Sequence, residues 1–228
     1  MKLAFKTVLI YSVISTLFSV TVWAQQNLDD SKAYKKVVTE RADKIVVNLG
    51  ITEADKTAKV RDIIAQQYID LNEIHDTRNN AIKNLKEINK ENKEKAEPAI
   101  KRLEEKADKK LKKLHKKYIA KLNKNLSAEQ VEKVKDGMTY GVLPITYKGY
   151  QEMLPNLTVE QKKQILLYLT EAREYAMDAE SSEKKHGWFG KYKGKINNYL
   201  SKAGIDMNKA SKEWQQRIKD EAASKKTN

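Results

Sequence analysis

The sequence predicts an all-α fold in which a long antiparallel helical hairpin precedes a compact helical bundle. Only 3 prolines and 8 glycines occur in 228 residues, and Lys, Glu, Ala and Leu are abundant, which is typical of long helices. Apolar residues recur at intervals of three and four, whereas the alternation of a β-strand is almost absent. We therefore expect residues 25–228 to form one all-helical domain, with hairpin arms at about 53–124 and an aromatic-rich bundle at about 126–222.

Residues 1–24 have the pattern of a cleavable signal peptide. Lys2 and Lys6 precede an apolar run from Val8 to Val22, and small residues fit a cleavage site after Ala24. The run is shorter than the about 20 apolar residues of a membrane span, although an uncleaved anchor is the alternative. Because the chain has no cysteine, neither a disulfide nor a lipid anchor on cysteine is expected. We expect a soluble exported protein, periplasmic or secreted, with no stable membrane insertion after cleavage.

The charge balance favours a polyanionic partner. Loss of Lys2 and Lys6 lowers the formal net charge from +14 to +12, with both signs interleaved along the chain. A basic surface of this kind attracts nucleic acid, anionic lipid or acidic polysaccharide. Export disfavours nucleic acid, so the sequence predicts an acidic polysaccharide or oligosaccharide as partner and no nucleic acid.

The first expected helix covers residues 31–49 and ends at Gly50, a residue suited to the left-handed conformation after a helix end. Thr52 followed by Asp55 predicts a capping box at the start of the first hairpin arm.

Pro98 is expected in the first turn of the second arm, where its missing N–H costs nothing. The chain should reverse around residues 93–96, and the resulting register brings His75 near His115.

The second half of the chain is expected to form shorter helices, and a capping residue marks the start of each one. Residues 138–149 contain glycine and proline and are expected to be irregular. A hexamer, Asn-Leu-Ser/Thr-x-x-Gln, stands at two of the starts; it resembles a signature of small helical periplasmic chaperones, but helix capping explains both copies. The four expected helix starts are Ser127 with Gln130 and Thr158 with Gln161, which carry the hexamer, and Ser182 with Glu183 and Asp206, which do not.

Residues 177–200 combine aromatic and basic side chains. At helical spacing the aromatic residues share one face, while a histidine, lysines and an asparagine form stripes beside it. One interpretation is a sugar site in which rings stack on the saccharide and Lys or Asn hold its carboxylates; the other is a solvated basic face above an aromatic core. The candidate residues are His186 as a catalytic group, and Trp188, Lys191, Tyr192, Lys193 and Asn197 for substrate binding.

Two further sets of residues are candidates. His75 and Arg78 lie on or beside the apolar stripe of the first hairpin arm, so Arg78 needs a carboxylate partner, from the protein or from a ligand, unless it extends to the solvent. Glu171 and Asp178 share one stripe of the helix expected at 159–179, whereas Arg173 of the same helix faces elsewhere. Such a stripe also fits the edge of an amphipathic helix.

If the chain is an enzyme, β-elimination suits these residues best. A lyase needs a base, for which His186, His75 or Tyr140 are candidates. It also needs a group that neutralises the enolate, for which Arg78, Arg173, Lys193 or Asn197 are candidates. A glycosidase is less well supported, because Glu171 and Asp178 lie about 10 Å apart along a helix. The sequence predicts no metal site and no cofactor, since it contains no ligand cluster, phosphate loop or nucleotide fingerprint.

Several motifs resemble a known family. They are the stretches 176–186 and 188–200, and the run Lys135-Asp136-Gly137-Met138-Thr139-Tyr140-Gly141. All three resemble a secreted bacterial family catalogued as domain of unknown function 3826, whose members often lie in polysaccharide-utilisation gene clusters, pectin-type ones among them. The resemblance implies a genomic setting and no established mechanism.

Together these observations predict an exported protein that binds or acts on acidic, uronate-containing polysaccharide of the pectin type, with a polysaccharide lyase as one form of that activity. The alternative is a helical periplasmic chaperone or adaptor that uses the 53–124 hairpin as its partner surface. Convergence of His75, Arg78, Tyr140, Glu171 and His186 in one cleft would favour the first function, and an exposed apolar groove on the hairpin would favour the second. The oligomeric state is left open.

Overall fold

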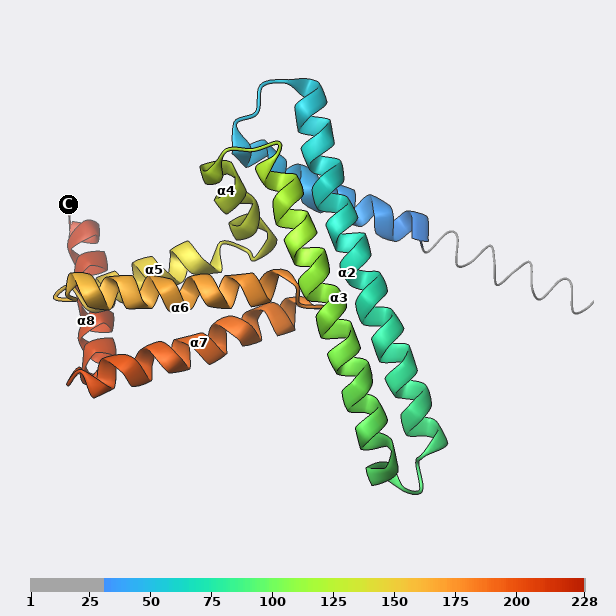
Figure 1. Ribbon diagram of the computed structural model, residues 1–228. Coiled ribbons are helices and arrows are strands. Elements are labelled where there is room, and N and C mark those ends of the chain that lie inside the picture. Colours follow the sequence, from blue (N-terminus) through green and yellow to red (C-terminus); the bar gives the residue numbers. More distant parts are fainter. Residues whose placement is uncertain (1–30, 228) are drawn as a thin grey trace, which may run out of the picture.

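The computed structural model describes residues 31–227, which form helices and short turns with no β-strand among them (Figure 1). The predicted all-α fold is confirmed. The predicted signal peptide, residues 1–24, lies outside the described residues. No helix within residues 31–227 combines the length and the apolar composition that crossing a membrane requires.

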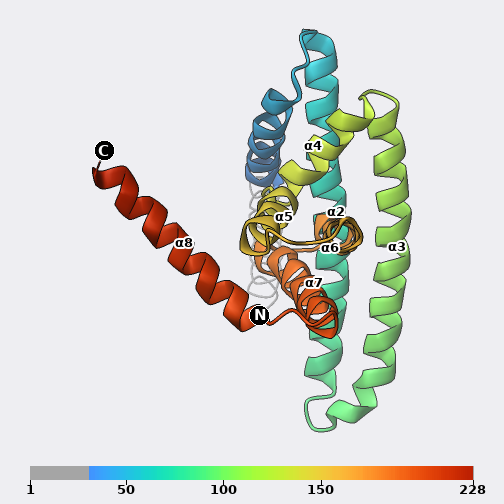
Figure 2. The same cartoon turned by 90° about the vertical axis from the view of Figure 1, so that its left-hand side faces the viewer.

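Helices α2 (Ala54–Ile88) and α3 (Glu97–Asn123) form the predicted antiparallel hairpin, joined by the short 3-10 helix η2 (Lys93–Ala96). The two helices run side by side in both views (Figure 1 and Figure 2). Pro98 lies in the first turn of α3, as predicted. The facing sides bury residues at three- and four-residue spacing, including Val60, Ile64 and Leu71 on α2 and Ala107, Leu111, Tyr118 and Leu122 on α3.

The start of α2 differs from its prediction. The N-cap residue is Glu53, whose side chain makes no capping hydrogen bond, and the hydroxyl of Thr52 donates to the Glu53 carboxylate at 3.4 Å. The expected capping box of Thr52 and Asp55 is therefore wrong. Because the helix begins at Ala54, Thr52 stands one position too early to accept from the amide of the third helical residue.

A helix over residues 31–46 lies against the hairpin and continues into the 3-10 helix η1 (Val47–Leu49). It ends as expected at Gly50, whose φ of 66° is in the left-handed region. This helix, the hairpin and α4 (Ala128–Met138) enclose a first hydrophobic core, which includes Val38, Ala42, Ile45, Val60, Ile64, Leu122, Val134 and Met138.

A second core lies among α5 (Val142–Met153), α6 (Val159–Met177) and α7 (Ser182–Lys202). Helices α6 and α7 run antiparallel to each other and crosswise to the hairpin, and α8 (Met207–Thr227) lies at their far end (Figure 1). The predicted aromatic packing face of α7 is buried here. This core includes Ile165, Leu169, Ala172, Ala176, Phe189, Tyr192, Ile196 and Leu200.

Three of the four caps predicted for the second half are confirmed, and the fourth is displaced by one residue. Ser127 and Thr158 each accept from the amide of a Gln three residues later, and that Gln side chain accepts from the cap amide in return. The carboxylate of Asp206 accepts from the amides of Asn208 and Lys209. Helix α7 is capped by Ser181, one residue earlier than expected.

The expected irregular stretch at 138–149 is wrong, since α5 occupies most of it. Only Thr139–Gly141 is a turn, in which Tyr140 and Gly141 have φ values of 59° and 66°. Pro144 lies in the first turn of α5, where a missing N–H breaks no helical hydrogen bond. Gly141 and Pro144 therefore mark the start of a helix rather than an irregular stretch.

Gly137 sets the approach of α4 to the helix over 31–46. A Cβ atom at this position would lie 2.9 Å from Cγ1 of Ile45 and 3.1 Å from Cγ2. We predict that Gly137→Ala lowers the free energy of unfolding by about 1–2 kcal/mol, because overpacking outweighs the gain in helix propensity. The matched change Gly194→Ala, at a helical glycine with no neighbour within 4 Å, should raise it by about 0.5–1 kcal/mol. Urea titrations of both variants test this, and equal effects would contradict it.

Candidate functional site

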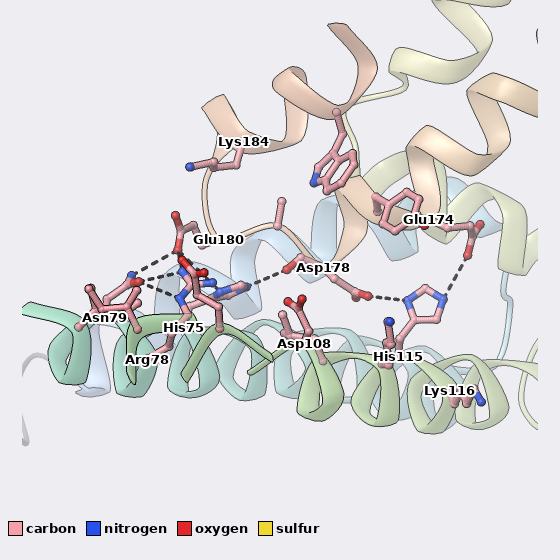
Figure 3. Close-up of a pocket in the computed structure, with 18 of the residues that line it drawn as sticks. His75, Arg78, Asn79, Asp108, His115, Lys116, Glu174, Asp178, Glu180 and Lys184 are labelled. Carbon is pink, nitrogen blue, oxygen red and sulfur yellow. Dashed lines mark hydrogen bonds and ion pairs between the residues drawn. The ribbon is translucent and has the colours of Figure 1, made fainter. Parts of the chain in front are cut away.

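The main candidate site is a cleft of about 810 Å³ between the hairpin and the corner where α6 turns into α7 (Figure 3). We call it the hairpin cleft. Both hairpin arms, the end of α6, the connection at 178–181 and the start of α7 contribute to it. The lining residues used below are His75, Arg78, Asn79, Lys86, Asp108, Lys112, His115, Lys116, Glu174, Tyr175, Asp178, Glu180, Lys184 and Trp188.

Two aromatic rings form a shelf in the hairpin cleft. Tyr175 of α6 and Trp188 of α7 stack with ring centres 4.5 Å apart and an angle of 16° between planes. The amine of Lys191 lies 5.0 Å from the centre of the Trp188 ring. Tyr175 keeps 45% of its surface exposed although it stacks on its neighbour, so the shelf offers apolar area to a bound molecule.

His115 of α3 lies between two carboxylates of the opposite wall (Figure 3). Its Nε2 is 3.2 Å from Glu174 and its Nδ1 is 3.0 Å from Asp178. Hydrogen bonds to Asp178 and Glu174 raise the pKa of His115 to about 9, despite partial burial. Burial raises the pKa of Glu174, but His115 and Lys135 together lower it to about 2. His115 is therefore a cation at neutral pH.

The connection at 178–181 is also tied to α2. His75 Nε2 lies 2.8 Å from the backbone oxygen of Asp178; because a carbonyl only accepts, this nitrogen carries the proton. Its Nδ1 is 3.7 Å from a Glu180 carboxylate oxygen. Arg78 donates to the same Glu180 carboxylate, and Asn79 donates to it at 3.3 Å. Arg78 thus has a carboxylate partner from the protein, one of the two alternatives left open by the sequence.

The structure brings only some of the candidate residues together. His75, Arg78, Asp178 and Trp188 line the hairpin cleft, and Lys191 lies against Trp188. Tyr140 and His186 stack on each other, with ring centres 5.6 Å apart, but neither lines that cleft.

The remaining candidates lie outside the hairpin cleft. Glu171 is an exposed residue of α6, and burial together with this neighbouring carboxylate raises the pKa of Tyr192. Tyr192 itself is buried, with the amine of Lys195 4.0 Å from its ring centre. Asn197 accepts a hydrogen bond from the Tyr150 hydroxyl at 2.7 Å, and Lys193 is exposed.

Arg173 is held within the protein. It is 2% exposed and donates to Asp136 at 2.6 Å and to Glu132, with Glu174 3.8 Å away. These carboxylates join α4 to α6. Because its charge is already neutralised inside the fold, we leave Arg173 out of the candidate site.

Three residues whose ion pairs shape the cleft were not identified as candidates from the sequence: His115, Glu174 and Glu180. His115 follows the α3 stripe positions Leu111 and Leu114, so a histidine at the edge of an apolar stripe was the available signal. Within the described residues, no group of three or more His, Cys, Asp or Glu side chains is arranged to hold a metal ion.

Comparison with known protein families places the chain in a family. The model of a family described as "Protein of unknown function (DUF3826)" matches residues 35–220, which is most of the chain. A comparison with curated proteins found no match.

The role assigned to Arg173 predicts a large stability effect. Arg173→Met should lower the free energy of unfolding by about 3 kcal/mol, because it leaves Glu132, Asp136 and Glu174 close together without their shared cation. Arg102→Met provides the control, since Arg102 is exposed on α3 and its loss should change stability by about 0.5 kcal/mol or less. Denaturant unfolding of both variants measures the difference; comparable losses would show that Arg173 is not structural.

The His115 ion pairs predict a pH dependence of stability. The folded-state pKa of about 9 exceeds the ordinary value of 6.5, so between these values the folded state binds more protons than the unfolded state. The free energy of unfolding should therefore fall as pH rises through this range. Between pH about 6.5 and 8, His115→Gln should remove about 1 kcal/mol of this decline, allowing for solvent screening. Measurements stop at about 8 because the pKa of Lys185, lowered by burial, lies there. Parallel pH profiles for wild type and variant would refute the assignment.

Proposed function

We propose that this chain, which belongs to the DUF3826 family of proteins of unknown function, binds an acidic saccharide in the hairpin cleft. The observation that carries the proposal is the exposed Tyr175–Trp188 shelf beside a set of charged side chains in one cleft of saccharide size. Ligand pockets commonly combine an apolar face with a few fixed polar groups in this manner. An aromatic face can pack on the C–H face of a sugar ring, and polar groups then orient its hydroxyls and carboxylates.

The charges around the cleft support an acidic ligand. Three of the five lining carboxylates are paired: Glu174 and Asp178 share His115, and Glu180 pairs with Arg78. The other two, Glu104 and Asp108, form no ion pair within residues 31–227 and are outnumbered by the unpaired lysines. Lys112, Lys116 and Lys184 line the cleft without an ion pair to any residue in 31–227. These lysines remain available for the carboxylates of a uronate. Two expectations from the sequence favour a pectin-type uronate: the export of the chain, and the polysaccharide-utilisation gene clusters, pectin-type ones among them, that the family resemblance implies.

Binding is better supported than catalysis. His75, the base candidate in the cleft, is 5% exposed and uses its protonated Nε2 on the backbone of Asp178. His115 is a cation at neutral pH and is suited to holding negative charge rather than to accepting a proton. A glycosidase would need both carboxylates of the pair Glu171 and Asp178 in one cleft, but Glu171 does not line the hairpin cleft.

The hairpin offers little to the adaptor alternative. Of the large hydrophobic residues of α2 and α3, only Ile88 is strongly exposed. The other apolar residues of both arms lie buried or half-buried along the facing sides. A partner surface built on this hairpin would therefore be charged rather than apolar, which again favours an anionic ligand.

Charge-matched variants of α3 test the proposal. Lys112→Gln combined with Lys116→Gln should weaken binding of oligogalacturonate about ten-fold at low salt, because two cleft cations are lost. Lys109→Gln combined with Lys113→Gln has the same spacing and the same charge change on exposed positions outside the cleft, and should bind nearly as the wild type does. Calorimetric titration measures both affinities.

Variants of the aromatic shelf test the same proposal independently of the lysines. Trp188→Ala should abolish measurable binding, whereas Trp214→Ala on α8, outside the cleft, should not. Ultraviolet absorbance of unsaturated product, followed in the same samples, reports any β-elimination. Absence of binding to oligogalacturonate and other uronic oligomers, or equal losses in the paired lysine variants, would overturn the proposal.

A further inference from the structure

A second cleft, of about 640 Å³, carries a different charge pattern. It shares His75, Ala179 and Glu180 with the hairpin cleft and is otherwise lined by the helix over 31–46, α2, α4, the Thr139–Gly141 turn and the start of α7. Because three of its lining residues are Tyr34, Tyr68 and Tyr140, we call it the tyrosine cleft. We propose that it binds a doubly charged oxyanion group, a phosphate or a sulfate, independently of the saccharide in the hairpin cleft.

Three of the four lining cations of this cleft lack counter-ions; the fourth, Lys133, pairs with Glu129 at 2.9 Å. Arg41, Lys44 and Lys185 line the cleft, and none of them forms an ion pair with any residue that the structure describes. Its one lining carboxylate is Glu180, which already accepts from Arg78 and Asn79 on its other side. Clustered cations of this kind repel each other and favour a ligand with more than one negative charge.

Lys185 is the most constrained of these cations. It is 6% exposed, and its amine donates to the backbone oxygens of Ala176 and Met177 at 3.1 and 3.2 Å. An ammonium group has three N–H donors, so one remains for a ligand. Burial, aided by nearby Arg41 and opposed by Asp178, lowers the pKa of Lys185 to about 8. A bound anion would restore the charged form, which links binding to pH.

Uncharged donors surround the same space. Helix α7, which is 21 residues long, begins at Ser182, and Ser181 and Ser182 line the cleft; the N-terminus of such a helix favours anions.

The tyrosines add hydroxyl groups. Tyr140 is 53% exposed and is held at a positive φ, which is costly for a residue other than glycine. Burial raises the pKa of Tyr68 to about 12, so its hydroxyl remains protonated. Cations, hydroxyls and a helix N-terminus on several sides match a tetrahedral oxyanion, which presents three or four acceptor oxygens, better than they match a planar carboxylate.

Titration of the full chain with inorganic phosphate and inorganic sulfate tests the inference, with galacturonate as a singly charged comparison. We expect phosphate or sulfate to bind at least ten-fold more tightly than galacturonate at this cleft. Affinity should decrease above pH about 8 as the Lys185 amine loses its proton. Equal affinity for the three anions, or no saturable binding of phosphate and sulfate, would overturn the proposal.

Paired variants locate the site. Arg41→Gln combined with Lys44→Gln should weaken phosphate binding about ten-fold, and both positions are exposed, so folding should be preserved. Lys32→Gln combined with Lys35→Gln has the same spacing and charge change on exposed positions of the same helix outside the cleft, and should bind phosphate as the wild type does. Oligogalacturonate binding should be unchanged in the Arg41/Lys44 variant, which separates this inference from the proposed function. Equal losses in the two pairs would place phosphate elsewhere on the basic surface.

Discussion

The four residues that connect α6 to α7 are fixed to both arms of the hairpin by polar contacts. The Asp178 carboxylate pairs with His115 of α3, the Asp178 backbone oxygen accepts from His75 of α2, and Glu180 pairs with Arg78 of α2. A charge buried without its partner costs several kcal/mol, so each contact constrains where the α6–α7 pair meets the hairpin. The crosswise arrangement of the two halves (Figure 1), and with it the shape of both clefts, depends on this junction.

The two clefts that meet at this junction differ in which of their charged side chains are paired. In the hairpin cleft, the carboxylates of the α6–α7 corner are paired, and the unpaired lysines outnumber the unpaired carboxylates Glu104 and Asp108 beside the Tyr175–Trp188 shelf. In the tyrosine cleft, Arg41, Lys44 and Lys185 have no carboxylate of their own. The first arrangement suits a sugar that carries spaced carboxylates, and the second suits a compact group of higher charge. His75 and Glu180 line both clefts, whereas the unpaired cations of the two clefts are different residues.

Helix α4 links this junction to the rest of the fold. Asp136 and Glu132 on α4 hold Arg173 of α6, while Gly137 lets the helix over 31–46 approach closely. The turn that follows places Tyr140 at a positive φ and against His186 of α7. The first and second hydrophobic cores are thus joined through a short segment in which close packing, buried charge and a strained turn occur within a few residues of each other.

The sequence alone determined the features that depend on neighbours a few residues apart. Three- and four-residue spacing identified the hairpin arms and the buried face of α7, and the hydroxyl–Gln pairs identified the starts of α4 and α6, because helical periodicity and capping are local. Only the tertiary structure decided which charges meet. Arg78 and Glu180 are 102 positions apart, and Arg173 and Glu132 are 41 apart; no periodicity relates them. The same limit explains why His115 and Glu174 were missed and why only some of the candidate residues line the hairpin cleft. The crosswise packing of two helical pairs, rather than any local pattern, brings these residues together or separates them.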